Sequence, residues 1–219
     1  MFTFARKKQK RMRKLIILVT AIFLSVPSVL VAKDTPNSRQ ARKIFEEVYQ
    51  KTFGPQGCTL HYAVNIIGIY KTEGTIWYKG NKSKFVDERF SAFNDGVNHY
   101  LVERKKKTVH IHKATSEKRD KYATKFVFEK ENFDYQIEDN RQGLLLTLKA
   151  KPHTKGIKLI KVLLEKGTHT PLSLRIKLGI FSTTIKVSDY KSGSIADALF
   201  VFPKEKYKSY QYIDHRGEE

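Results

Sequence analysis

Two histidines, His110 and His112, lie two residues apart in an alternating segment, so their rings would point to one side of a strand. Such a pair can begin a metal site, but a metal also needs a third ligand, and the sequence offers no Cys, His or carboxylate cluster to supply it. Cys58 could act as a nucleophile, yet a lone cysteine that opens an apolar strand is more typical of a core residue. No Gly-rich phosphate loop, nucleophile elbow or His-Glu-x-x-His motif is present. We therefore expect a non-enzyme without a metal or cofactor.

The remaining candidates for chemistry are aromatic. Trp77 and Tyr78 are adjacent in "EGTIWYKGNKSKFVDE", within a chain of formal net charge +20, which raises the possibility of base stacking on nucleic acid. Adjacent strand residues point to opposite sides of a sheet, so the two rings cannot form one stacking platform. We expect Ile76 and Tyr78 to point inward together and exclude nucleic acid as a partner.

The first 32 residues predict export. They carry seven basic residues and no acidic one, followed by the apolar run Leu15–Ala32, which is interrupted by Pro27 and ends in small residues. This pattern predicts a signal peptide that is cleaved near Ala32 and leaves a periplasmic protein, with Met12 as a possible true start; an uncleaved anchor is the alternative. Residues 33–219 would form one domain, which keeps +13 of the +20 charge on 187 residues. Its anionic neighbours would be phospholipid headgroups, lipopolysaccharide or an acidic protein.

One helix and a series of strands would build this domain. An apolar stripe at helical spacing predicts a helix from Ser38 to the stop at Gly54 and Pro55. Strands are predicted at 58–66, 73–79, 84–90, 97–102, 108–112, 133–138, 144–150, 158–165, 172–178, 183–189 and 198–203, with a hairpin turn at Asn94–Gly96. The charged segment Lys113–Lys125 is either a loop or a short helix.

Ten or eleven short antiparallel strands after one amphipathic helix predict a mainly β (α+β) fold with a single curved sheet. One helix covers only part of such a sheet, so its concave side is a natural apolar ligand site. Strand parity, which a one-residue register shift would reverse, gives the candidate lipid-binding wall: Leu60, Tyr62, Val64, Ile66, Ile76, Tyr78, Phe85, Tyr100 and Val102.

The order of these motifs resembles the LolA-type periplasmic outer-membrane lipoprotein carriers over residues 38–216. Those carriers show a Gly-x-Leu-Trp strand, a Ser-Asp-Gly hairpin and a late Ala-x-Phe-x-Phe-x-Pro strand. The corresponding residues here are Gly74, Ile76 and Trp77, then Asn94-Asp95-Gly96 with Tyr100, then Ala198, Phe200, Phe202 and Pro203, trailed by Ile213, Asp214 and Arg216.

This resemblance implies an incomplete antiparallel barrel around a cavity for lipoprotein acyl chains. It also implies an inner-membrane lipoprotein-releasing transporter and an outer-membrane acceptor as partners, and we expect a monomer. Gly80 and Asn81 replace the family's basic residue and proline, and the charged Lys113–Lys125 segment replaces its apolar lid helix, so gating would differ. The alternative is a lipid-sensing or envelope scaffold protein that binds a protein partner. The basic turns Lys79–Lys84 and Arg104–Lys107 would form a docking rim, or would serve only solubility.

Overall fold

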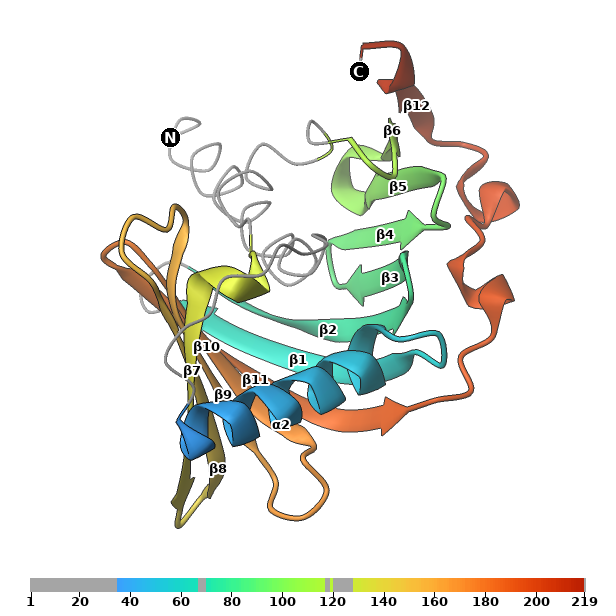
Figure 1. Cartoon of the computed structure of the whole chain (residues 1–219). Helices are drawn as coiled ribbons and strands as arrows, with labels where there is room; N and C mark the ends of the chain where they lie inside the picture. The colour runs from blue at the N-terminus through green and yellow to red at the C-terminus, as the bar shows by residue number, and fades with distance from the viewer. Residues whose placement is uncertain (1–34, 67–69, 117–118, 120–127, 219) are drawn as a thin grey trace. The chain divides into compact units, whose positions relative to one another are not determined.

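The computed structural model describes residues 35–66, 70–116, 119 and 128–218 (Figure 1). The predicted signal peptide and most of Lys113–Lys125 lie outside these residues. Within the described part of the chain, no helix is long and apolar enough to cross a membrane.

Helix α2 spans Pro36–Phe53 and is amphipathic, as predicted. It begins two residues earlier than expected, because the Thr35 hydroxyl accepts a hydrogen bond from the Ser38 backbone N–H at 3.1 Å and caps the helix, with Pro36 at its first position. Ala41, Ile44 and Phe45 are its buried apolar residues. The apolar stripe predicted from the sequence is therefore the buried side of α2.

The structure contains a sheet of twelve strands in the order β12-β6-β5-β4-β3-β2-β1-β11-β10-β9-β8-β7. Neighbours from β2 to β6 and from β7 to β11 pair antiparallel where they adjoin, whereas β12 pairs parallel with β6. The predicted mainly β fold with an N-terminal helix is confirmed. The strands are β1 Cys58–Ile66, β2 Tyr70–Lys79, β3 Lys82–Asp87, β4 Phe90–Asn94, β5 Asn98–Glu103, β6 Thr108–Lys113, β7 Phe133–Asn140, β8 Gly143–Ala150, β9 Ile157–Leu164, β10 Pro171–Leu178, β11 Phe181–Ser192 and β12 Gln211–Asp214.

The chain divides into two compact units. Among the described residues, unit 1 comprises 35–48, 64–66, 70–71 and 128–187, and unit 2 comprises 49–63, 72–116, 119 and 188–218. Strands β7–β10 belong to unit 1 and strands β3–β6 and β12 belong to unit 2, while α2, β1, β2 and β11 contribute residues to both.

In unit 1, the first part of α2 packs on the edge strand β7. The ring of Phe45 meets the ring of Tyr135 edge-on at 5.3 Å. The Asn37 side chain donates to the Ile137 carbonyl at 2.8 Å and accepts from its N–H at 3.1 Å. An edge strand presents unpaired backbone groups, and this amide satisfies two of them.

In unit 2, the C-terminal segment follows the strands β2–β6 and ends as β12 beside β6 (Figure 1). The predicted strand 198–203 is wrong: two 3-10 turns, Asp197–Phe200 and Lys204–Tyr207, occupy this region instead. The alternating apolar residues bury aromatic rings, with Phe200 1% exposed, rather than pairing in the sheet. Strand β12 was not predicted.

The predicted strand 84–90 is in fact the end of β3 and the start of β4. The Asp87 carboxylate accepts hydrogen bonds from the N–H groups of Arg89 and Phe90, at 2.7 and 2.6 Å, and closes a tight turn between the strands. Asp and Asn side chains favour such turns because they mimic the backbone. This turn adds a strand before the Asn94–Gly96 hairpin.

Candidate lipid-binding site

One side of β1–β3 in unit 2 is apolar and faces α2. The ring of Phe53, in α2, meets the ring of Tyr78 at 4.8 Å. Ile76 lies two residues from Tyr78 on β2 and is the cross-strand partner of Phe85, whose ring stacks on Tyr62 at 5.7 Å. Because cross-strand partners share a side, these residues form one continuous apolar surface, the helix-facing side of unit 2.

Gly74 makes room for Tyr62 on this side. A Cβ atom at Gly74 would lie 2.9 Å from the Tyr62 hydroxyl oxygen and would also collide with the Val86 carbonyl oxygen. Gly74, the glycine of the motif that resembles Gly-x-Leu-Trp, thus has a packing role that could not be predicted from the sequence.

The structure buries most of the predicted wall. Leu60 and Val64 are 7% and 4% exposed, on the same side of β1 as Tyr62 by strand parity. The side chain of Ile66 lies outside the described residues. Whether any of these side chains contacts lipid stays a prediction.

Tyr100 and Val102 do not share this side. They pair with Phe93 and Ser91 of β4, whereas Phe85 pairs with Ala92, which pairs in turn with Leu101. The prediction that placed Tyr100 and Val102 on one wall with Phe85 is a one-residue register error, made because β4 was not recognised. On this side, β4 and β5 instead present Ala92 and Leu101.

The opposite side of unit 2 is closed by an aromatic cluster from the C-terminal segment. The ring of Phe202 stacks on Tyr100 at 4.4 Å with an interplanar angle of 7°, and meets Phe93 edge-on at 5.6 Å. Phe93, Val102, Val109 and Tyr207 form the buried centre of this cluster. It is a packed core, so we do not place a ligand there.

Trp77 lies on this opposite side, as the parity argument requires. The Lys84 ammonium lies 4.9 Å from the centre of the Trp77 ring and 5.5 Å from that of Phe93. Burial and, to a lesser extent, the positive charge of Lys206 lower the pKa of Lys84. Cation–π contact and partial burial give Trp77 a structural explanation that needs no nucleic acid.

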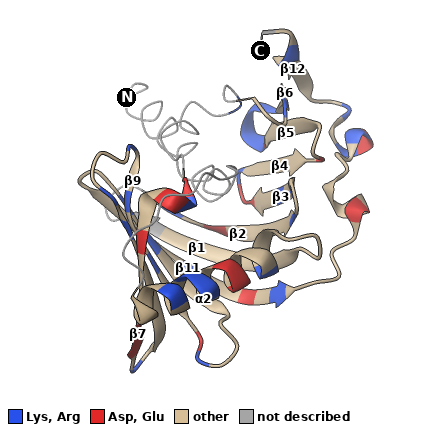
Figure 2. Ribbon diagram, in the orientation of Figure 1, with Lys and Arg blue, Asp and Glu red and all other residues tan. Residues whose placement is uncertain are grey.

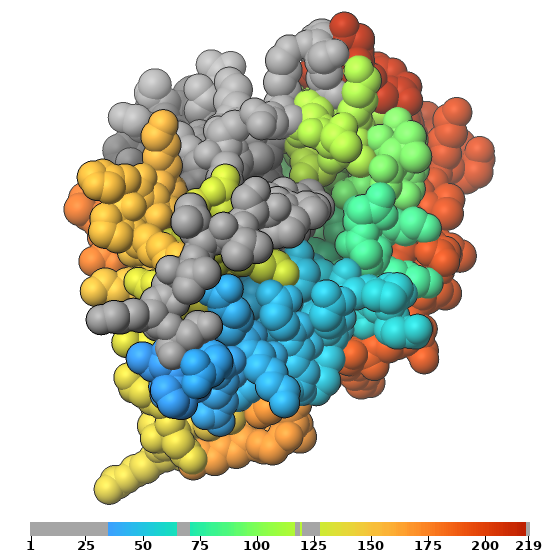
Figure 3. Space-filling model, viewed as in Figure 1, coloured from blue at the N-terminus to red at the C-terminus, as the bar shows by residue number. Residues whose placement is uncertain are grey.

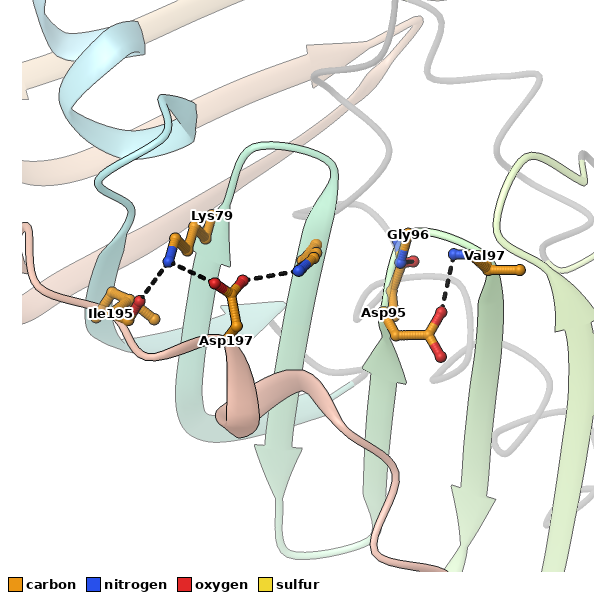
Figure 4. Close-up of polar contacts among 8 residues, drawn as sticks. Lys79, Asp95, Gly96, Val97, Ile195 and Asp197 are labelled. Atoms are coloured by element: carbon orange, nitrogen blue, oxygen red, sulfur yellow. Dashed lines mark hydrogen bonds and ion pairs between the residues drawn. The ribbon is translucent and has the colours of Figure 1, made fainter.

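The basic turn after β2 is tied to the C-terminal segment. Lys79 and Lys82 form ion pairs with the Asp197 carboxylate at 3.1 and 2.7 Å, and Lys79 also donates to the Ile195 carbonyl at 2.8 Å (Figure 4). Hydrogen bonds from these two lysines lower the pKa of Asp197. At the other predicted turn, Lys106 pairs with Glu103 at 2.6 Å. Several lysines of the predicted docking rim are thus engaged within the fold.

The Asn94–Gly96 hairpin is confirmed. The Asp95 carboxylate accepts from the N–H of Val97 at 2.8 Å (Figure 4) and from that of Asn98 at 2.7 Å, and Gly96 adopts a positive φ of 94°.

Cys58 is fully buried, and burial raises the pKa of its thiol to about 12. A nucleophilic cysteine needs a lowered pKa and access to solvent, so this thiol has the character of a core residue.

The structure supplies a neighbour for the two histidines that the sequence did not reveal. His110 Nδ1 lies 3.0 Å from His215 Nε2, and the ring of His215 stacks on His112 at 4.5 Å. Within the described ranges, no group of three His, Cys, Asp or Glu side chains has the arrangement of a metal site. The first contact is a hydrogen bond between imidazoles, which joins the chain after β12 to β6.

Unit 1 has an apolar side of its own that the sequence analysis did not include. This side includes Tyr135 of β7, which contacts α2. It extends over β8, β9, β10 and β11 as two rows of residues that are cross-strand partners. One row is Tyr135, Leu148, Ile160 and Ile176; the other is Ile137, Leu146, Val162, Leu174 and Ile185.

Within the second row, the outer residues Ile137, Leu146 and Ile185 are buried, while Val162 and Leu174 at its middle are only half-buried. These two positions leave apolar surface available to a ligand on the helix-facing side of unit 1. The alternation of β8–β10 could have suggested this side, but not which of its residues stay accessible.

No family model matches the sequence, and no curated protein matches it. Among solved structures, an uncharacterized conserved protein from Thermus thermophilus aligns with a TM-score of 0.55 and 10% identity, over 80% of this chain and 99% of that chain. A LolA superfamily protein from Nitrosomonas europaea aligns at 0.38 and 9%, over 74% and 97% of the two chains. The lipoprotein LppX from Mycobacterium tuberculosis aligns at 0.41 and 15%, over 72% and 98%. The chain therefore shares the fold of the Thermus thermophilus protein.

Proposed function

We propose that this protein is a periplasmic carrier that binds the acyl chains of lipoproteins on the apolar side of its sheet and shuttles them from the inner to the outer membrane. It performs no reaction on them. By resemblance to the LolA-type carriers, it would receive cargo from an inner-membrane lipoprotein-releasing transporter and deliver it to an outer-membrane acceptor.

The half-buried pair Val162 and Leu174 carries this proposal. Both are apolar, both lie on the helix-facing side of unit 1, and both are flanked by fully buried members of the same row. A flexible acyl chain is the kind of ligand that contacts such positions through apolar surface alone.

The proportion of sheet to helix supports the same function. A helix about 10 Å across covers about two strands spaced about 4.8 Å apart. α2 is the only α-helix among the described residues, beside a sheet of twelve strands. In unit 2, Tyr62, Ile76 and Phe85 of the predicted wall are at most 2% exposed, so the accessible apolar surface of this proposal lies in unit 1.

The direct test is native mass spectrometry of protein purified from the periplasm, with titration of a fluorescent fatty acid. We expect a lipid or lipoprotein adduct and saturable fatty-acid binding. Persistent absence of an adduct together with no fatty-acid binding would exclude the carrier. Recovery of a single membrane protein in pull-downs, without lipid, would favour the scaffold alternative.

A matched pair of substitutions locates the site. Val162→Trp adds a bulky ring to the proposed contact surface and should weaken fatty-acid binding severalfold. Thr184→Trp adds the same ring on the opposite, exposed side of the unit 1 strands and should leave binding unchanged. If Val162→Trp does not fold, Leu174→Phe is a milder substitute at the neighbouring position. Equal affinity for both tryptophan variants would remove this side as the site.

A further inference from the structure

The turn between β10 and β11 exposes two large apolar side chains next to each other. Ile180 is 89% exposed and Phe181 is 70% exposed. The strands close with the pair Leu178 and Phe181, so the turn has two residues, with Gly179 at a positive φ of 57° as such a turn requires. Exposed Ile and Phe on a tight turn contribute nothing to the core, so their placement calls for a partner.

The surroundings of this turn are strongly basic. Residues 143–188 contain nine Lys or Arg and a single acidic residue, Glu165. Leu178 pairs with Ile157 at the start of β9, which brings the exposed Lys155 of the β8–β9 turn and the exposed Lys158 of β9 close to the Ile180 turn. Figure 2 shows basic residues at the β8–β9 turn, and the yellow-orange and orange atoms of this region lie at the surface in Figure 3.

The outward side of the same strands is basic as well. Its cross-strand rows, on the side opposite Leu148 and Ile176, carry Lys149, Lys161, Arg175, Lys177 and Lys186. The acidic residues on this side are Asp134 and Glu138, which lie on the edge strand β7. Positive charge therefore surrounds the apolar turn on its strands and on the adjacent turn.

We propose that the Ile180–Phe181 turn is a membrane-docking site: the two side chains enter the interface of an anionic bilayer while the neighbouring lysines contact lipid headgroups. Charge complementarity selects this partner, because same-sign charge around a small apolar projection matches an anionic lipid surface. A stable protein interface needs about 800 Å² on each partner, far more than two side chains on a turn provide. The site goes beyond the carrier function, since docking does not require bound cargo.

Sedimentation with vesicles tests this docking. Protein purified from the periplasm should bind vesicles of mixed phosphatidylcholine and phosphatidylglycerol, bind pure phosphatidylcholine weakly, and lose binding as salt is added. Ile180→Ser with Phe181→Ser should weaken binding about tenfold or more, since each side chain loses burial in the interface. As a matched control, Val97→Ser with Val201→Ser removes two apolar side chains that are 72% and 64% exposed elsewhere and should have no effect.

A matched pair of triple variants tests how much the lysine charges contribute to vesicle binding. Replacing Lys155, Lys158 and Lys177 by Gln should weaken binding to the mixed vesicles by about fivefold per lysine. Replacing the exposed Lys191, Lys204 and Lys208 by Gln removes the same net charge from unit 2 and should have a much smaller effect.

A spectroscopic readout shows which part of the chain inserts. With Trp77→Phe as background, Phe181→Trp should shift its emission to shorter wavelength on mixed vesicles, and brominated lipid should quench it. Val97→Trp in the same background should show neither effect. Absence of vesicle binding at low salt, unchanged binding of the Ile180 and Phe181 variant, or equal emission of the two tryptophans would each overturn the proposal.

Discussion

Acidification should destabilise unit 2 through His99. This residue lies on β5, opposite Asn94 and His112 of the neighbouring strands, and its Nδ1 is buried with no hydrogen-bond partner within the part of the chain that the structure describes. Burial lowers the pKa of His99 to about 3, and the positive charges of Arg119 and His112 act in the same direction. The folded state therefore holds this imidazole neutral.

The sign and size of the effect follow from proton linkage. An unfolded histidine has a pKa of about 6.5, so between about pH 6.5 and about pH 3 the unfolded chain binds a proton that the folded chain does not. The free energy of unfolding consequently falls as the pH falls, by about 1.4 kcal/mol per pH unit. Lowering the pH from about 6.5 to about 5 should cost about 2 kcal/mol through His99 alone.

Urea unfolding followed by the fluorescence of Trp77, the only tryptophan, measures this quantity in unit 2. His99→Gln removes the titration, so the free energies of parent and variant should converge by about 2 kcal/mol between about pH 6.5 and about pH 5. His153→Gln, at an exposed turn, should keep the parental slope. The reasoning would be refuted if His99→Gln lost stability with acid as steeply as the parent.

Three further measurements test the packing. Phe202→Ala should lower the free energy of unfolding by about 2–4 kcal/mol through lost ring contacts, whereas Val201→Ala, at a 64% exposed side chain, should change it by less than about 0.5 kcal/mol; equal effects in urea would contradict the aromatic cluster. Cys58 should react with a thiol reagent at mildly alkaline pH only after unfolding, because burial raises its pKa to about 12, and rapid labelling of the folded protein would show otherwise. Gly74→Ala should cost about 1–3 kcal/mol, because its Cβ would collide with the Val86 carbonyl oxygen and crowd the Tyr62 hydroxyl at 2.9 Å; an unchanged melting temperature would argue against this close packing.

Local patterns predicted the elements that local physics determines. The stripe of α2, the alternation of β1 from Cys58 to Ile66 and the Asn94–Gly96 hairpin all follow from interactions within a few residues. Strand parity also separated Trp77 from Tyr78 correctly. These features need no knowledge of what packs against them.

Features that depend on distant parts of the chain could not be predicted in this way. The turn made by the Asp87 carboxylate, by contrast, is a local feature that the sequence analysis missed; it creates β4 and thereby reverses the side that Tyr100 occupies. The stacking of Phe202 on Tyr100 and the contact of His215 with His110 join segments about a hundred residues apart. Alternation alone cannot distinguish a strand from a segment that buries its rings on one.

Strand β10 connects the two proposals within unit 1. Its alternating residues place Leu174 and Ile176 on the apolar side, Arg175 and Lys177 on the basic side, and the exposed Ile180 just beyond its end. The period of two therefore gives one strand the proposed acyl-chain surface and the proposed headgroup surface, and the side chain proposed to enter the bilayer follows at its end. Because successive side chains of β10 point to opposite sides of the sheet, a single substitution on one side need not disturb the other side. Cargo binding and membrane docking should therefore be separable by the variants above, although both proposed sites lie in unit 1.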